Sequence, residues 1–269
     1  MVALADAKGE ARRRPQRIHR QLRLVPVFPS RKIPNTGPTF NDDDRARVAL
    51  TFADGPSADV TPAFSHALDN SGVKATFFLC GAAAVRYTAI MRDIANRGHG
   101  VENRTSDHPF LVGLPPSFWA DQITRTTDVL QDLTGMIVRP FRPPCGRVNQ
   151  RVLAWLADHD MLPVLWSSVD YDWIEGNPKR IEDHAVGQVQ PVEFVLLHCA
   201  AGEFLRRPHR RCKHQTEDRM PSLHVVPPII TSLSSLDLTP VSLPQPTLGH
   251  ARRTYRRPYP LRSTRAGIR

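Results

Sequence analysis

Several polar side chains stand where a run of apolar residues ends, which is where a parallel strand would present them for chemistry. Asp54 closes the first such run, Val48–Phe52, and is followed by Gly55 and Pro56. A buried strand that stops at a carboxylate places that carboxylate at the rim of a sheet, where it can bind a metal ion or take a proton. Asp-Gly-Pro is also typical of an ordinary turn. Asp54 alone therefore does not indicate a functional site. It becomes a candidate site residue because polar groups also follow the later apolar runs.

The same placement recurs four times along the chain. The later groups are Asn103–Pro109, Arg142–Gly146, Asp170–Trp173 and His198 with Cys199. Taken singly they are weak signals, because a lone histidine is commonly structural and Arg-Pro-Pro commonly forms a rigid turn. Since the carboxyl ends of parallel strands share one edge of a sheet, five such groups together indicate a common site.

The elements that must position these groups alternate along the chain. Strands are predicted at Val48–Phe52, Ala75–Cys80, Gly100–Asn103, Pro140–Arg142, Leu162–Ser167, Glu193–His198 and Leu238–Leu243. Helices are predicted near Thr61–Asn70, Ala84–Arg97, Ser117–Leu133, Asn149–His159, Pro178–Val186 and Pro227–Leu233. Alternating strands and helices predict an α/β fold with a mostly parallel sheet, and about seven units favour closure into a (β/α) barrel.

The residues in this order resemble those of the polysaccharide deacetylases, also called family 4 carbohydrate esterases. The resemblance covers Arg47 to Leu243. Its motifs are Leu50–Pro56 (LTFxDGP), Lys74–Phe78 (KATFF), Gly98–Asn103 (GHGVEN) and Phe141–Gly146 (FRPPxG), with further matches at Leu165–Ser167, Asp172–Trp173 and Val195–His198. It implies a distorted (β/α) barrel of about seven parallel strands. The implied reaction is hydrolysis of N-acetyl or O-acetyl groups on sugar polymers, by a divalent metal, often zinc, held by one Asp and two His.

The resemblance also assigns roles to individual residues. Asp54 and His108 would be metal ligands. Arg142 would pair with the catalytic base, and the backbone N–H of Cys145, where the family usually has Tyr, would help to form an oxyanion hole.

A second part of the implied site lies later in the chain. His198 would donate a proton, and Asp172 would hold its ring in the right tautomer. Trp173 would form a wall of the sugar groove.

Two positions depart from the family pattern. Ala53 stands where the family has the base aspartate, and Arg104 stands where it has the first metal histidine. An alanine has no lone pair with which to take a proton, and a guanidinium stays charged and repels a divalent cation. These changes predict a metal-poor, weakened or inactive deacetylase that retains carbohydrate binding, with Arg104 forming a forked pair with Asp54 and Arg142 left without its carboxylate partner.

Alternatives remain open from the sequence. A site that is simply decaying would look the same. A third metal ligand from Asp107, Cys199 or Cys145 would instead keep an active hydrolase acting on carbon–nitrogen bonds. The four cysteines have no CxxC spacing and no disulfide framework.

The charge of the chain is concentrated in its flanks. The formal net charge is +10, and residues 1–45 hold 10 Lys and Arg against 5 Asp and Glu, while residues 245–269 hold 7 against 0. We therefore predict a basic flexible arm over 1–45, a deacetylase-like domain over 46–244 with a basic loop at 204–220, and a basic disordered tail over 245–269. The tails could contact anionic polymers, which leaves a polyanion-binding protein as an alternative, whereas the acidic centre argues against a core that reads nucleic acid.

No signal peptide or membrane span is visible, so as written the chain is expected in the cytoplasm, although the family is often exported.

Overall fold

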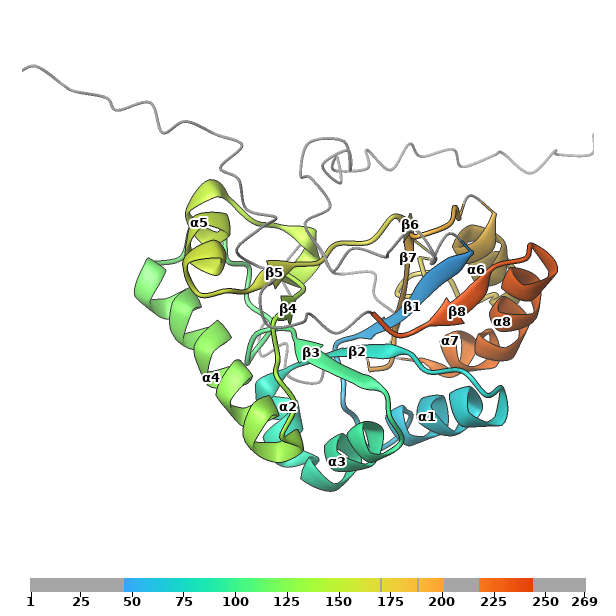
Figure 1. The fold of residues 1–269 in the computed structure, drawn as a ribbon, viewed down its shortest axis with the longest axis horizontal. Coiled ribbons are helices and arrows are strands. Elements are labelled where there is room, and N and C mark those ends of the chain that lie inside the picture. Colours follow the sequence, from blue (N-terminus) through green and yellow to red (C-terminus); the bar gives the residue numbers. More distant parts are fainter. Residues whose placement is uncertain (1–45, 170, 188, 201–217, 244–269) are drawn as a thin grey trace, which may run out of the picture.

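The computed structural model describes residues 46–169, 171–187, 189–200 and 218–243 (Figure 1). The predicted arm over 1–45, the tail over 245–269 and residues 204–217 of the predicted basic loop lie outside the described residues. Among the described helices, none combines the length and the apolar character needed to cross a membrane.

A parallel sheet forms the centre of the structure. Its order is β5 (Leu162–Pro163), β4 (Pro140–Phe141), β3 (Gly100–Asn103), β2 (Thr76–Leu79), β1 (Arg47–Ala53), β7 (Phe194–His198) and β6 (Ser168–Val169), and β8 (Thr239–Val241) pairs with the first half of β1. The register places Ala53, the last residue of β1, beside Phe78 of β2 and His198 of β7. The carboxyl ends of three central strands therefore meet at one place.

Helices cover the outer face of the curved sheet (Figure 1). They are α1 (Thr61–Asn70), α2 (Gly81–Arg86), α3 (Thr88–Asn96), α4 (Pro116–Thr134), α5 (Gln150–Asp158), α6 (Pro178–Val186), α7 (Met220–His224) and α8 (Val226–Ser235), with a 3₁₀ turn at Pro144–Gly146. The result is the predicted distorted (β/α) barrel.

Side chains of β1 alternate between the two faces of the sheet. Leu50 and Phe52 join the large apolar cluster under the helices, where the Phe52 ring meets Phe64 of α1 edge-on at 5.2 Å. Ala49 belongs to a small separate cluster that includes Phe78. Both faces of the strand are buried, as expected for a parallel strand covered on each side, and this fixes the direction in which β1 delivers Asp54.

The structure corrects three boundaries. The predicted helix Ala84–Arg97 is two helices, α2 and α3, because the backbone leaves helical geometry at Tyr87 (φ −117°, ψ 48°). The predicted strand Leu162–Ser167 is shorter, and a separate strand, β6, follows it. Met220, predicted to end a loop, begins helix α7.

The two outer strands of the sheet, β5 and β6, are joined directly by the chain. The Val164 N–H donates to the Phe141 carbonyl at 2.8 Å, and the Ser167 N–H donates to the Phe194 carbonyl at 3.1 Å. One short segment thus bonds to β4 at its start and to β7 at its end. This bridge closes the barrel where strand pairing does not.

A buried guanidinium fastens the bridge to the central strand. Arg142 is fully buried, and its Nη1 donates to Thr51 Oγ1 at 2.8 Å. Its Nε and Nη2 face the carbonyls of Val164 and Leu165 at 3.4 and 3.3 Å. The guanidinium carbon lies 3.9 Å from the centre of the Phe78 ring, a cation–π contact. Arg142 therefore holds β1, β2 and the bridge together from inside.

We predict that Thr51→Val lowers the free energy of unfolding by about 1 to 3 kcal/mol, because it leaves a buried guanidinium N–H of Arg142 without its acceptor and the Val195 carbonyl without the hydroxyl that donates to it. Urea unfolding followed by circular dichroism measures the change. Thr231→Val is the matched control, since its hydroxyl bonds only the Pro227 carbonyl on the exposed side of α8. Equal stabilities for the two variants would show that Thr51 does not support Arg142.

Candidate functional site

The carboxylate of Asp54 is the centre of the site. Asp54 follows β1 in left-handed geometry (φ 74°), which turns its side chain across the ends of the strands. Arg104 Nε lies 2.8 Å from Asp54 Oδ1, and His108 Nε2 lies 3.2 Å from the same oxygen. His198 Nε2 lies 3.8 Å from Oδ2. Asp54, His108 and His198, which come from three separate strand ends, are therefore brought together as the sequence predicts.

Arg104 is held from two sides. Its side chain is 2% exposed, and its Nη1 donates to the Pro143 carbonyl at 2.9 Å. The predicted pairing with Asp54 is confirmed, but the predicted forked geometry is wrong, because only Nε faces the carboxylate while Nη1 turns to the backbone. The guanidinium thus fills the space beside Asp54 and is fixed there by the Arg-Pro-Pro turn.

The electrostatics of the cluster follow from burial and from these contacts. Burial alone would raise the pKa of Asp54, but Arg104 and His108 outweigh it, so the pKa lies well below the ordinary value. Burial lowers the pKa of His108. The negative charge of Asp54 acts to raise this pKa and the positive charge of Arg104 acts to lower it, and the net shift is downward. Asp54 is thus ionised and His108 is held toward its neutral form.

The donor set does not fit the divalent metal that the resemblance implies. Among the described residues, no three His, Cys, Asp or Glu side chains are arranged to hold a metal ion. Asp54 and His108 are two donors, and the third direction is taken by a guanidinium 2.8 Å from the carboxylate. A fixed positive charge there repels a divalent cation, and catalytic zinc normally has three protein ligands.

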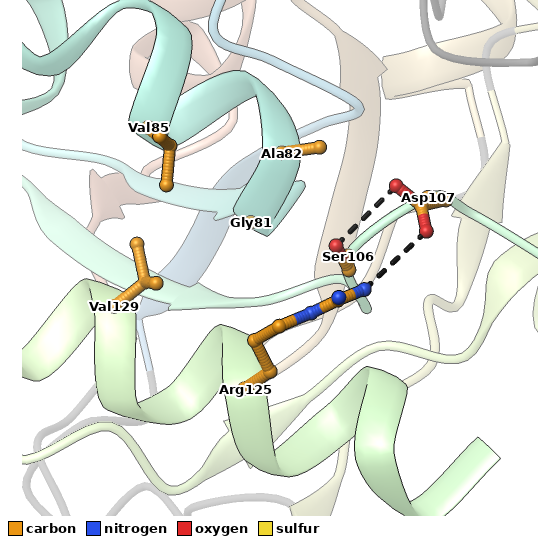
Figure 2. A pocket seen from close by; sticks show the side chains of 7 residues that line it. All are labelled: Gly81, Ala82, Val85, Ser106, Asp107, Arg125 and Val129. Carbon is orange, nitrogen blue, oxygen red and sulfur yellow. Dashed lines mark hydrogen bonds and ion pairs between the residues drawn. The ribbon is translucent and has the colours of Figure 1, made fainter. Parts of the chain in front are cut away.

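The three residues considered as a substitute ligand are placed elsewhere or are poorly suited. Asp107 lies next to His108 in sequence, but its carboxylate accepts from Gln122 Nε2 at 2.8 Å and faces Arg125 of α4 at 3.5 Å. Asp107 lines an open pocket of about 490 Å³ together with residues of α2 and α4, and Figure 2 shows its side chain among theirs. Cys199 is fully buried, and burial with the nearby Asp54 charge raises its pKa to about 12, which disfavours a thiolate ligand. Cys145 is exposed.

The other half of the site is a carboxylate–histidine pair. His198 Nδ1 lies 2.6 Å from Asp172 Oδ1, and the His198 backbone N–H donates to Asp172 Oδ2 at 2.7 Å. Burial would raise the pKa of Asp172, but the attraction of His198 outweighs it and the pKa is lowered. The Trp173 ring meets the His198 ring edge-on at 5.4 Å. The pairing of His198 with Asp172 is the one that the sequence predicts, whereas the contact of His198 with Trp173 was not predicted.

Arg142 and Cys145 have surroundings that the motifs alone do not reveal. Among the described residues, no carboxylate lies within ion-pair distance of Arg142. Its side chain was expected to face the mouth of the barrel, but it is fully buried inside the barrel. Burial and the positive charge of Arg104 lower the pKa of Arg142 well below its ordinary value. The charge of Asp54 acts to raise this pKa but does not outweigh them. Cys145 and Gly146 both have left-handed backbone geometry (φ 53° and 65°), which forms the tight turn that follows Arg142.

Three residues of the site were missed by sequence reasoning. Thr51 accepts from Arg142, and Arg219 and Ser222 contact Asp172. Thr51 lies inside a recognised motif but reads there as an ordinary strand residue. Arg219 and Ser222 lie outside every motif, and the sequence carried no signal for them.

Comparison with known proteins shows which family the chain resembles in sequence and fold. Residues 40–164 match the family profile described as polysaccharide deacetylase. A chitooligosaccharide deacetylase of Rhizobium leguminosarum bv. trifolii is 30% identical over 76% of this chain and 92% of its own length. The chain belongs to the polysaccharide deacetylase family.

Two further relatives agree with that assignment. A peptidoglycan-N-acetylglucosamine deacetylase of Bacillus cereus is 34% identical over 61% of this chain, and the match spans 59% of that protein's length. The solved structure of a peptidoglycan N-acetylglucosamine deacetylase has a TM-score of 0.67 at 31% identity, covering 77% of this chain and 89% of the other. The likeness therefore extends from the sequence motifs to the fold.

We predict that Asp54→Asn lowers the free energy of unfolding by about 3 kcal/mol at pH 7, because it leaves the buried Arg104 charge without its carboxylate. Urea unfolding measures the loss. Asp107→Asn is the matched control, since its carboxylate is 47% exposed and its pair with Arg125 is solvated.

The effect should depend on pH with a definite sign. Because the pKa of Asp54 is lowered in the folded state, the stabilisation is complete above about pH 4, the ordinary carboxyl value, and is lost as the pH falls through the lowered pKa. The difference between the original protein and Asp54→Asn should therefore persist from pH 7 to pH 5 and shrink below pH 4. An Asp54→Asn protein as stable as the original at pH 7 would contradict the ion pair.

Proposed function

We propose that this chain binds N-acetylated saccharides at the carboxyl ends of its strands, and that its deacetylase chemistry is strongly reduced. The observation that carries the proposal is the buried Arg104 guanidinium 2.8 Å from Asp54. It stands at the motif position of a metal histidine and satisfies the carboxylate that would otherwise hold the metal.

The chain retains the residues for one half of acetamide hydrolysis. Hydrolysis requires an activated water, stabilisation of the developing oxyanion and a proton for the leaving amine. His198, oriented by Asp172, is placed to supply the proton. The backbone N–H of Cys145, in the turn after Arg142, would be the oxyanion donor.

The other half of the reaction is the activation of water, and the described residues place no general base at Ala53 and no third metal ligand beside Asp54 and His108 to carry it out. Ala53 offers no lone pair, and a positioned general base typically contributes about 100- to 10,000-fold to the rate. The fixed charge of Arg104 opposes a divalent ion that would lower the pKa of the attacking water. The rate of hydrolysis is therefore expected to fall by at least the factor that a general base supplies. The groups proposed to contact the sugar remain in place.

The names of the relatives support the class of ligand. They are described as acting on peptidoglycan and on chitooligosaccharides, which share N-acetylglucosamine. We propose that the ligand of this chain is likewise an acetylated polysaccharide or oligosaccharide. This is a proposal because the match spans only 59% of the Bacillus cereus protein. The half-buried Trp173 beside His198 offers an apolar wall on which a sugar ring can lie.

We predict that the double variant Ala53→Asp, Arg104→His hydrolyses acetylated chitooligosaccharides in the presence of added zinc or cobalt, at least 100-fold faster than the original protein. The first substitution restores the base, and the second restores a neutral metal ligand. Released acetate measures the rate. Each single change supplies only one missing group and should remain near the original rate.

Two results would contradict this prediction. Hydrolysis by the original protein at the rate of the double variant would mean that Ala53 and Arg104 do not limit the reaction. A folded double variant that binds metal but does not hydrolyse the oligomers would mean that the remaining half of the site is not competent.

We also predict that the original protein binds acetylated chitooligosaccharides without turnover, and that Trp173→Ala weakens this binding about 5- to 50-fold by removing the aromatic wall. Isothermal titration calorimetry measures both. Phe118→Ala is the control, because Phe118 is an exposed aromatic residue on α4. Equal weakening by the two variants, or no binding by the original protein, would argue against a saccharide site at the strand ends.

A further inference from the structure

Helix α7 lies against the carboxylate–histidine pair, although none of the motifs recognised in the sequence includes it. Ser222, fully buried in α7, donates from its Oγ to Asp172 Oδ2 at 2.9 Å. Arg219, which caps the start of the same helix and is 3% exposed, donates from Nη1 to the Asp172 carbonyl at 3.1 Å. One short helix therefore contacts both the side chain and the backbone of Asp172.

The hydrogen bonds to Asp172 fix its carboxylate completely. Oδ1 faces His198 Nδ1 at 2.6 Å, while Oδ2 accepts both from the His198 backbone N–H at 2.7 Å and from Ser222 Oγ. With Oδ2 held from two directions, the carboxylate plane cannot rotate freely about its Cβ–Cγ bond. Oδ1 is then held in line with Nδ1, so that ring nitrogen is the donor and Nε2 is directed toward Asp54.

Arg219 joins the two segments that carry the pair. Its Nε donates to the Ala200 carbonyl at 3.1 Å, two residues after His198, while its Nη1 holds the Asp172 carbonyl. The planar guanidinium has donors in a rigid arrangement, so one side chain sets the spacing between these two backbone carbonyls. A lysine in its place could hold only one of them well.

We infer that Arg219 and Ser222 are positioning residues, which hold Asp172 and through it fix the orientation and tautomer of His198. This inference rests on the proposed function, in which His198 is the proton donor. It extends the site to a helix outside the recognised motifs, and it assigns a role to two buried polar residues that the proposed reaction does not otherwise use. Removal of the partners that orient a metal-ligating histidine typically lowers activity about 10- to 100-fold, and we expect an effect of similar size for a proton-donating histidine.

The test uses the full chain and a signal that a purely structural role would not move. A proton in a short His–Asp hydrogen bond has a characteristic far-downfield NMR signal, and His198→Gln identifies the one that belongs to His198. We expect Ser222→Ala and Arg219→Lys to shift this signal upfield and to speed its exchange with water. Ser65→Ala is the matched control, because Ser65 is equally buried but bonds only the Pro62 carbonyl in α1.

A second readout uses the Ala53→Asp, Arg104→His background. There Ser222→Ala should lower kcat about tenfold and leave KM unchanged, since the hydroxyl orients the proton donor and does not contact the sugar. An inactive background would count against the proposed function, while the NMR signal would still decide the role of α7. An unchanged downfield signal in folded Ser222→Ala and Arg219→Lys proteins would overturn the inference, whatever the enzyme assays show.

Discussion

The site depends on one constraint: a carboxylate held at the buried end of a strand needs a cation beside it. β1 delivers Asp54 into a space where its side chain is only 12% exposed, so an ionised Asp54 without a partner would be costly. The family resemblance implies a metal ion as that partner. Here the Arg104 guanidinium takes its place, and the carbonyl of Pro143 fixes the guanidinium. The guanidinium balances the charge of the carboxylate, but it is neither a Lewis acid nor a base at neutral pH, so it cannot itself activate water.

This substitution separates the stability of the site from its chemistry. The Asp54 half of the site contains a protein cation, Arg104, whereas His198 and Asp172 form a buried carboxylate–histidine pair in the other half. Arg142 has no carboxylate partner among the described residues. It has a structural role instead, since it ties the bridge between β5 and β6 to Thr51 of β1.

The sequence predicted what depends on local patterns and on motifs. The strand that carries Asp54, the parallel sheet, the meeting of Asp54 with His108 and the pairing of Asp172 with His198 were all predicted correctly. The break at Tyr87 was missed, because the apolar pattern of the two helices runs on through it. The contacts of Arg219 and Ser222 with Asp172 were missed because they join residues 47 and 50 positions apart, which no local pattern encodes.

The central claim is that a guanidinium, and not a metal ion, balances the charge of Asp54. Elemental analysis of the purified original protein, after incubation with excess zinc and removal of unbound metal, tests it most directly. We expect the original protein to retain far less than one equivalent of zinc, and the double variant Ala53→Asp, Arg104→His, treated in parallel, to retain about one equivalent. Close to one equivalent of zinc in the original protein, lost on Asp54→Asn, would contradict it.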